Sequence, residues 1–142
     1  MDNSAELGDT IQEALQGAGE ACRSLSGFIL QAANHLRSGE IREGNELLAE
    51  VLDDFSQVAS LLEDVPRCGA FMKEGRQRVM DDLERESLEM ADLLKMAVTA
   101  QESEDWVFLA DILEYEFAQK LGSWDGLLSG LSRPVEAPQS PL

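Results

Sequence analysis

The sequence predicts an all-α protein, an antiparallel four-helix bundle made of two helical hairpins. Four segments carry apolar residues at gaps of three and four, which place one apolar stripe along a helix. Glycine and proline fall between these segments, and no segment shows the sustained period-two alternation of a half-buried strand. Short links favour antiparallel neighbours. We therefore expect a single domain over residues 1–132, with helices at about 5–37, 40–63, 70–100 and 105–131.

The first two expected helices are separated by Ser38-Gly39-Glu40, which supplies a glycine helix stop and a short turn. Pro66 closes the second helix because proline cannot continue it. The first stripe comprises Ile11, Leu15, Ala18, Cys22, Leu25, Ile29, Ala32 and Leu36. The second comprises Leu48, Val51, Leu52, Phe55, Ala59 and Leu62.

The last two expected helices are separated by the acidic turn 102–105, whose charges suit the start of a helix. The third stripe comprises Met72, Val79, Leu83, Met90, Leu94 and Val98. The fourth comprises Trp106, Leu109, Leu113, Phe117, Leu121, Trp124, Leu128 and Leu131. Three prolines follow Ser132, so residues 133–142 are expected to form a flexible Pro-rich tail.

The second and fourth helices contain similar segments. Leu47-Leu-Ala-Glu-Val-Leu-Asp53 aligns with Phe108-Leu-Ala-Asp-Ile-Leu-Glu114, and every position keeps its physical class. A duplicated helical hairpin explains this likeness. Two amphipathic helices that converged on similar sequences explain it equally well.

The chain is strongly acidic, with 28 Asp and Glu against 11 Lys and Arg and a net charge of −17. This charge argues against nucleic-acid partners, which need a basic surface, and against anionic membranes. The absence of a signal peptide or spanning segment predicts a cytoplasmic protein. The third helix carries the compensating bases, which we expect to pair with acids of the second or fourth helix: Arg67, Lys73, Arg76, Arg78 and Arg85.

The sequence offers little catalytic or metal chemistry. His35 is the single histidine, and Cys22 and Cys68 read as buried thiols rather than a disulfide or zinc ligands. We therefore expect no catalytic residue, no metal and no cofactor. The alternative is a magnesium site at Glu50-x-x-Asp53 and Asp111-x-x-Glu114. That spacing resembles the all-α nucleotide pyrophosphohydrolases of the MazG type, although the order of Asp111 and Glu114 departs from their motifs.

Phe108, Ile112 and Tyr115 form a second apolar row on the fourth helix. A helix that is apolar on two sides must bury both, inside the bundle or against a partner. This row is the candidate partner-binding surface, with no catalytic role assigned. The occupant is expected to be another protein or a second copy of the chain, which would give a homodimer.

The segment Asp105-Trp-Val-Phe-Leu-Ala-Asp-Ile-Leu-Glu-Tyr-Glu-Phe117 resembles a small uncharacterised bacterial family with a Leu-Ala-Asp-x-Leu-Glu-Tyr-Glu motif. In size, charge and helicity the chain is also similar to flagellar and type III export chaperones, by analogy alone. The resulting expectation is a non-enzymatic, protein-binding helical bundle, a chaperone or adaptor of a bacterial cytosolic system. The alternatives are the magnesium-dependent hydrolase and a purely structural homodimer.

Overall fold

The protein is all-helical in the part of the chain that the computed structural model describes, residues 4–64 and 77–132. The helices are α1 (Ser4–Arg37), α2 (Ile41–Asp64), α3 (Gln77–Glu102), α4 (Trp106–Asp111), a π-helical segment η2 (Ile112–Phe117) and α5 (Ala118–Ser132). No strand occurs within these two ranges, which confirms the all-α class. The expected start of the third helix near residue 70 and the expected tail lie outside the described residues.

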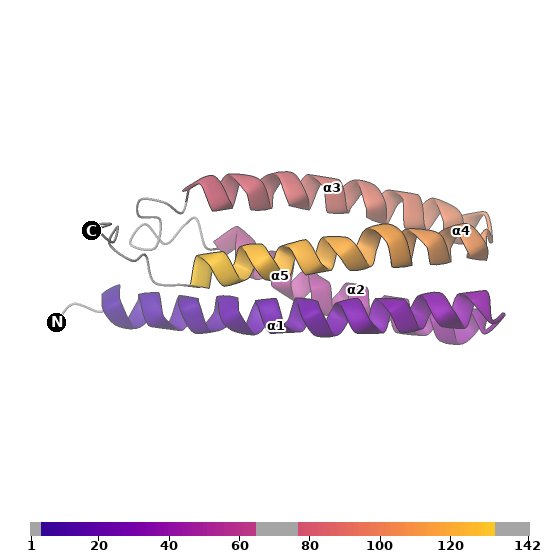
Figure 1. Cartoon of the computed structure of the whole chain (residues 1–142), viewed down its shortest axis with the longest axis horizontal. Coiled ribbons are helices and arrows are strands. Elements are labelled where there is room, and N and C mark those ends of the chain that lie inside the picture. Colours follow the sequence, from indigo (N-terminus) through magenta and orange to yellow (C-terminus); the bar gives the residue numbers. More distant parts are fainter. Residues whose placement is uncertain (1–3, 65–76, 133–142) are drawn as a thin grey trace, which may run out of the picture.

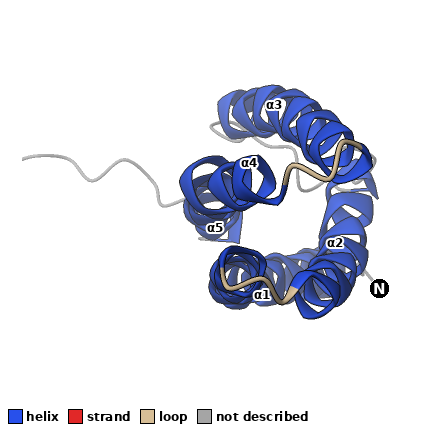
Figure 2. Ribbon diagram, turned by 90° about the vertical axis from the view of Figure 1, so that its right-hand side faces the viewer, coloured by secondary structure: helices blue, strands red, loops and turns tan. Residues whose placement is uncertain are grey.

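The last three segments form one continuous helix, hereafter the fourth helix, and they run side by side with the other helices (Figure 1). α1 lies between α2 and the fourth helix, and the fourth helix lies between α1 and α3, as the end-on view shows (Figure 2). The π-helical segment was not expected from the apolar pattern. A π-turn widens the helix by one residue, and such turns occur frequently at functional sites.

The predicted stripe of α1 is confirmed wherever its side chains are described, because every one of them from Leu15 to Leu36 is buried. Aromatic rings connect α2 to the fourth helix. Phe55 packs edge-on against Phe117 and Trp124, with ring centroids 6.2 and 5.0 Å apart. Phe117 and Trp124 are themselves almost fully buried. These contacts of α1, α2 and the fourth helix are made by the faces that the sequence predicted to be buried.

The stripe of α3 was partly wrong, because Val98 is 48% exposed. The buried positions after Leu83 and Met90 are instead Leu93, Ala97 and Ala100. The expected row advanced in steps of four from Met90 to Val98. Each such step overshoots a full turn by about 40°, so the row rotates away from the core.

The two turns that the structure describes between helices share a backbone hydrogen bond. The N–H of Glu40 donates to the carbonyl of His35 at 2.8 Å, and that of Asp105 donates to Ala100 at 2.9 Å. The residue before each donor has a positive φ, +81° at Gly39 and +54° at Glu104. This 6→1 bond with a left-handed residue is the Schellman pattern.

The two halves of the chain can be aligned by their turns or by their similar segments, and the two alignments differ. Superposing the turns places Ile41 on Trp106 and Leu48 on Leu113, whereas the segments pair Leu48 with Leu109. The two alignments differ by four residues, about one helical turn. Because a shift of one turn keeps side chains on nearly the same face, both alignments pair the buried Leu48 with a buried leucine.

None of the helices in the described ranges has the length and apolar character that crossing a membrane requires.

Candidate functional site

The candidate site lies on the fourth helix beside the C-terminus of α1. Asp105 begins this helix, and its Oδ1 accepts a hydrogen bond from the backbone N–H of Phe108 at 3.2 Å. Such a cap satisfies one of the amide groups left unpaired at a helix start. The first turn is thereby fixed, and it leaves Val107 and Phe108 66% and 44% exposed.

The predicted row of Phe108, Ile112 and Tyr115 does not form one exposed surface. Tyr115 is 60% exposed, but Ile112 is 3% exposed and belongs to the core. Ile112 and Leu113 are both buried although they are adjacent, because the fourth helix is packed between α1 and α3. Ile112 is therefore unavailable to a partner, and the candidate surface consists of Val107, Phe108 and Tyr115.

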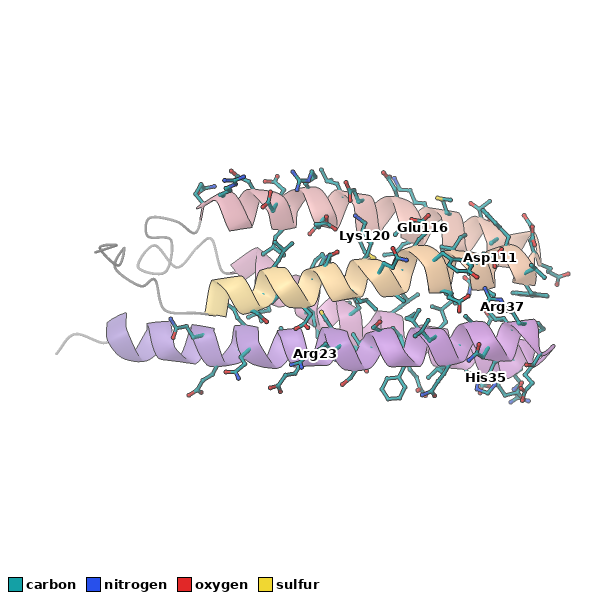
Figure 3. All side chains as sticks on the ribbon, viewed as in Figure 1. Arg23, His35, Arg37, Asp111, Glu116 and Lys120 are labelled. Atoms are coloured by element: carbon teal, nitrogen blue, oxygen red, sulfur yellow. The ribbon has the colours of Figure 1, made fainter. Side chains whose placement is uncertain are left out.

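Arg37, the last residue of α1, organises this surface, and Figure 3 shows it beside Asp111. Its guanidinium contacts Asp111 Oδ1 and Glu114 Oε2, each at 2.8 Å. Its Cζ also lies 5.8 Å from the centroid of the Tyr115 ring, within cation–π range. One side chain thus contacts the end of α4 and two residues of η2.

The environment of Arg37 favours its charged form. The hydrogen bond to Asp111 raises the pKa of Arg37 above its ordinary value, against a smaller opposing effect of desolvation, and the charge of Glu114 adds to the rise. The guanidinium is therefore a permanent cation between two carboxylates. Sequence reasoning missed Arg37 because nothing local to α1 shows which part of the fourth helix it will meet.

The arrangement also bears on the magnesium alternative. The Asp111-x-x-Glu114 carboxylates, considered as metal ligands, bind the Arg37 guanidinium instead. Glu50 and Asp53 are exposed on α2. Within the described residues, no three His, Cys, Asp or Glu side chains are grouped closely enough to hold a metal ion.

Among the described residues, the ion pairs between helices come from Arg23, Arg37 and Lys120, and neither Arg78 nor Arg85 takes part in one. Arg85 of α3 pairs with Asp82 of its own helix, at 3.1 Å, rather than with the second or fourth helix. Arg67, Lys73 and Arg76 lie outside the described residues. Arg85 and Asp82 are one helical turn apart, so they meet without any help from packing.

The base that joins the fourth helix to α3 is Lys120 of α5, which pairs with Glu86 at 2.9 Å and also with Glu89 (Figure 3). The hydrogen bond from Lys120 lowers the pKa of Glu89. The bonds to Glu89 and Glu86 raise the pKa of Lys120. Acids of α3 and a base of the fourth helix thus form this contact, the reverse of the expected polarity.

These features define an all-α protein with an exposed aromatic surface, in which Tyr115 lies against an interhelical arginine. The model of the family DUF8042, described as a domain of unknown function, matches residues 13–126. The match covers most of the chain, so the protein belongs to this family, and it includes the whole candidate site. No curated protein and no solved structure matches the chain.

Proposed function

We propose that the chain is a non-enzymatic, protein-binding four-helix bundle of two antiparallel hairpins, acting as a chaperone or adaptor in a bacterial cytoplasm. The observation that carries this proposal is the exposure of Phe108 and Tyr115 on the fourth helix, whose other sides are already buried in the core. Aromatic side chains contribute most strongly to protein interfaces. An aromatic pair left in water is therefore the best candidate for a partner's contact surface.

The Arg37 contacts support the same proposal. A side chain that is fixed before binding loses less conformational entropy when a partner arrives. Tyr115 lies against Arg37, which is itself bound to Asp111 and Glu114. The ring is thus partly ordered while it remains exposed, and both η2 residues that Arg37 contacts, Glu114 and Tyr115, lie in the uncommon π-helical segment.

Comparative affinity purification tests the proposal. The tagged full chain and a Phe108→Ala/Tyr115→Ala variant are used on the same native lysate, and partners are quantified by mass spectrometry. Leu88→Ala is the matched control, because Leu88 is an apolar residue of α3 that is 66% exposed. We expect the double variant to lose partners that the control keeps. Equal recovery by all three proteins, with unchanged circular dichroism, would mean that the surface is not used.

Self-association is the other way to cover Phe108 and Tyr115. Sedimentation equilibrium of the purified chain distinguishes it. A dimer that the double variant converts to monomer assigns the surface to a second copy. A chain that stays monomeric at all concentrations assigns the surface to a different protein as the partner.

A further inference from the structure

A second surface feature is a groove between α1 and α2, away from the candidate site on the fourth helix. Its volume is about 370 Å³, and both helices line it. The floor consists of Leu25 and Val58, which are largely buried, and Phe28 forms one wall with 44% of its surface exposed. The groove is thus an apolar depression that opens to solvent.

The length of the groove suits a helix. Its α1 wall extends from Ala14 to Phe28, fifteen residues that span about 21 Å at the rise of an α-helix. Three of the wall residues are alanines, Ala14, Ala18 and Ala21, so a ligand backbone can approach closely. The backbone amides within α1 and α2 are engaged in their own helices, which excludes strand addition and leaves side-chain packing as the recognition mode.

The charged side chains described at the groove are acidic. Asp54 lines it directly, and Glu50 lies one helical turn before Asp54 on the exposed side of α2. Neither of them belongs to an ion pair among the described residues.

The bases of the same two helices are already engaged. Arg23 pairs with Asp125, Arg37 with Asp111 and Glu114, and Arg42 with Glu46.

We propose that this groove binds an amphipathic helix of a partner protein that carries basic residues beside its apolar stripe. The apolar stripe fills the floor at Leu25 and Val58, and the basic residues neutralise Asp54 and Glu50. A second copy of this chain fits poorly, because its own α1–α2 face would bring the same acids together. The site is separate from Phe108 and Tyr115, so it stands or falls independently of the proposed function.

A labelled peptide tests the groove directly. The probe is a fourteen-residue helical peptide of leucine and lysine with one apolar face, and its fluorescence anisotropy is followed as the full chain is added. The matched peptide has glutamate in place of every lysine. We expect the lysine peptide to bind at least about tenfold more tightly than the glutamate peptide, because only the former complements the acids.

Three variants distinguish peptide binding in the groove from non-specific electrostatic attraction to an acidic protein. Asp54→Lys and the groove-filling Ser24→Trp are each expected to weaken lysine-peptide binding about tenfold or more. Asp92→Lys makes the same charge change at an exposed site on α3 and is expected to leave binding within about twofold. The Phe108→Ala/Tyr115→Ala variant is expected to bind the peptide normally, so failure of the groove and failure of the other surface are distinguishable.

Two results would overturn the proposal. Equal weakening by Asp54→Lys and Asp92→Lys would show attraction to net charge alone. A dimer of the free chain that Ser24→Trp converts to monomer would show that a second copy occupies the groove. Unchanged thermal unfolding of the variants is required in each comparison, and it is expected because all three substitutions are at exposed positions and leave the core intact.

Discussion

The guanidinium of Arg37 donates a hydrogen bond of 2.8 Å to Oδ1 of Asp111, joining the last residue of α1 to the last residue of α4. The two residues are 74 positions apart in the sequence. Because Asp111 directly precedes the π-helical segment, this bond fixes the start of η2 against α1. The exposed Tyr115 is positioned from the same side chain.

Replacing Arg37 with alanine is expected to lower the free energy of unfolding by about 1 kcal/mol, because a double ion pair and a cation–π contact are lost at a partly exposed site. Urea denaturation measures the change. Arg42→Ala is the control, since among the described residues Arg42 pairs with Glu46 alone, one turn away on a highly exposed face. It is expected to cost clearly less than Arg37→Ala. Equal costs would show that Arg37 does not hold the two helices together.

Two helical glycines are expected to respond oppositely to alanine. A Cβ at Gly17 meets nothing within 4 Å, so Gly17→Ala is expected to stabilise the protein by about 1 kcal/mol through helix propensity. A Cβ at Gly44 lies 2.8 Å from the buried Leu36 side chain and 3.2 Å from the Ala32 carbonyl oxygen. Gly44→Ala is therefore expected to destabilise it by about 1–2 kcal/mol. Thermal unfolding followed by circular dichroism compares them, and a stabilised Gly44→Ala variant would mean that α1 and α2 are not tightly packed there.

The two Schellman turns predict opposite effects on stability for introducing a glycine at one turn and replacing the glycine of the other. Glu104 occupies a left-handed conformation that favours glycine, so Glu104→Gly is expected to stabilise the protein by about 0.5–1 kcal/mol. Gly39→Ala is expected to destabilise it by about 1 kcal/mol, although a Cβ there meets no atom within 4 Å. Chemical denaturation checks both values. Loss of stability in Glu104→Gly would contradict the equivalence of the turns.

Cys22 is expected to be unreactive in the folded protein. It is fully buried, and desolvation together with the charge of Asp125 raises the pKa of its thiol from 9.0 to about 12. In a Cys68→Ser background, Ellman's reagent is expected to label Cys22 at mildly alkaline pH only on unfolding. Rapid labelling of the native protein would contradict the burial.

The same shift links stability to alkaline pH. Because the pKa of the Cys22 thiol is raised in the folded protein, the stability that this group contributes is fully present below about pH 9. It is lost as the pH rises through about 12. Between these values the unfolded thiol ionises while the folded one does not. Cys22→Ala is expected to reduce this alkaline loss of stability, as measured by denaturation at several pH values. An unchanged pH profile would assign the loss to other groups.

Part of the molecule follows from the sequence because it depends on local spacing. The gaps of three and four in α1 predict a helix whose inner side is buried from Leu15 to Leu36, and the structure places those residues there. The turn after Leu36 follows from Gly39, whose positive φ only glycine adopts readily. Fold class and much of the core are therefore local properties of this chain.

The candidate site depends instead on how the helices are packed. Phe108, Ile112 and Tyr115 share a row on the fourth helix, but packing between α1 and α3 buries Ile112 and leaves the other two exposed. The contact of Arg37 with Asp111 likewise requires the relative register of two helices. Spacing along one helix determines which residues share a face. Only the neighbouring helices decide which part of that face is covered, because burial depends on atoms that are distant in the sequence.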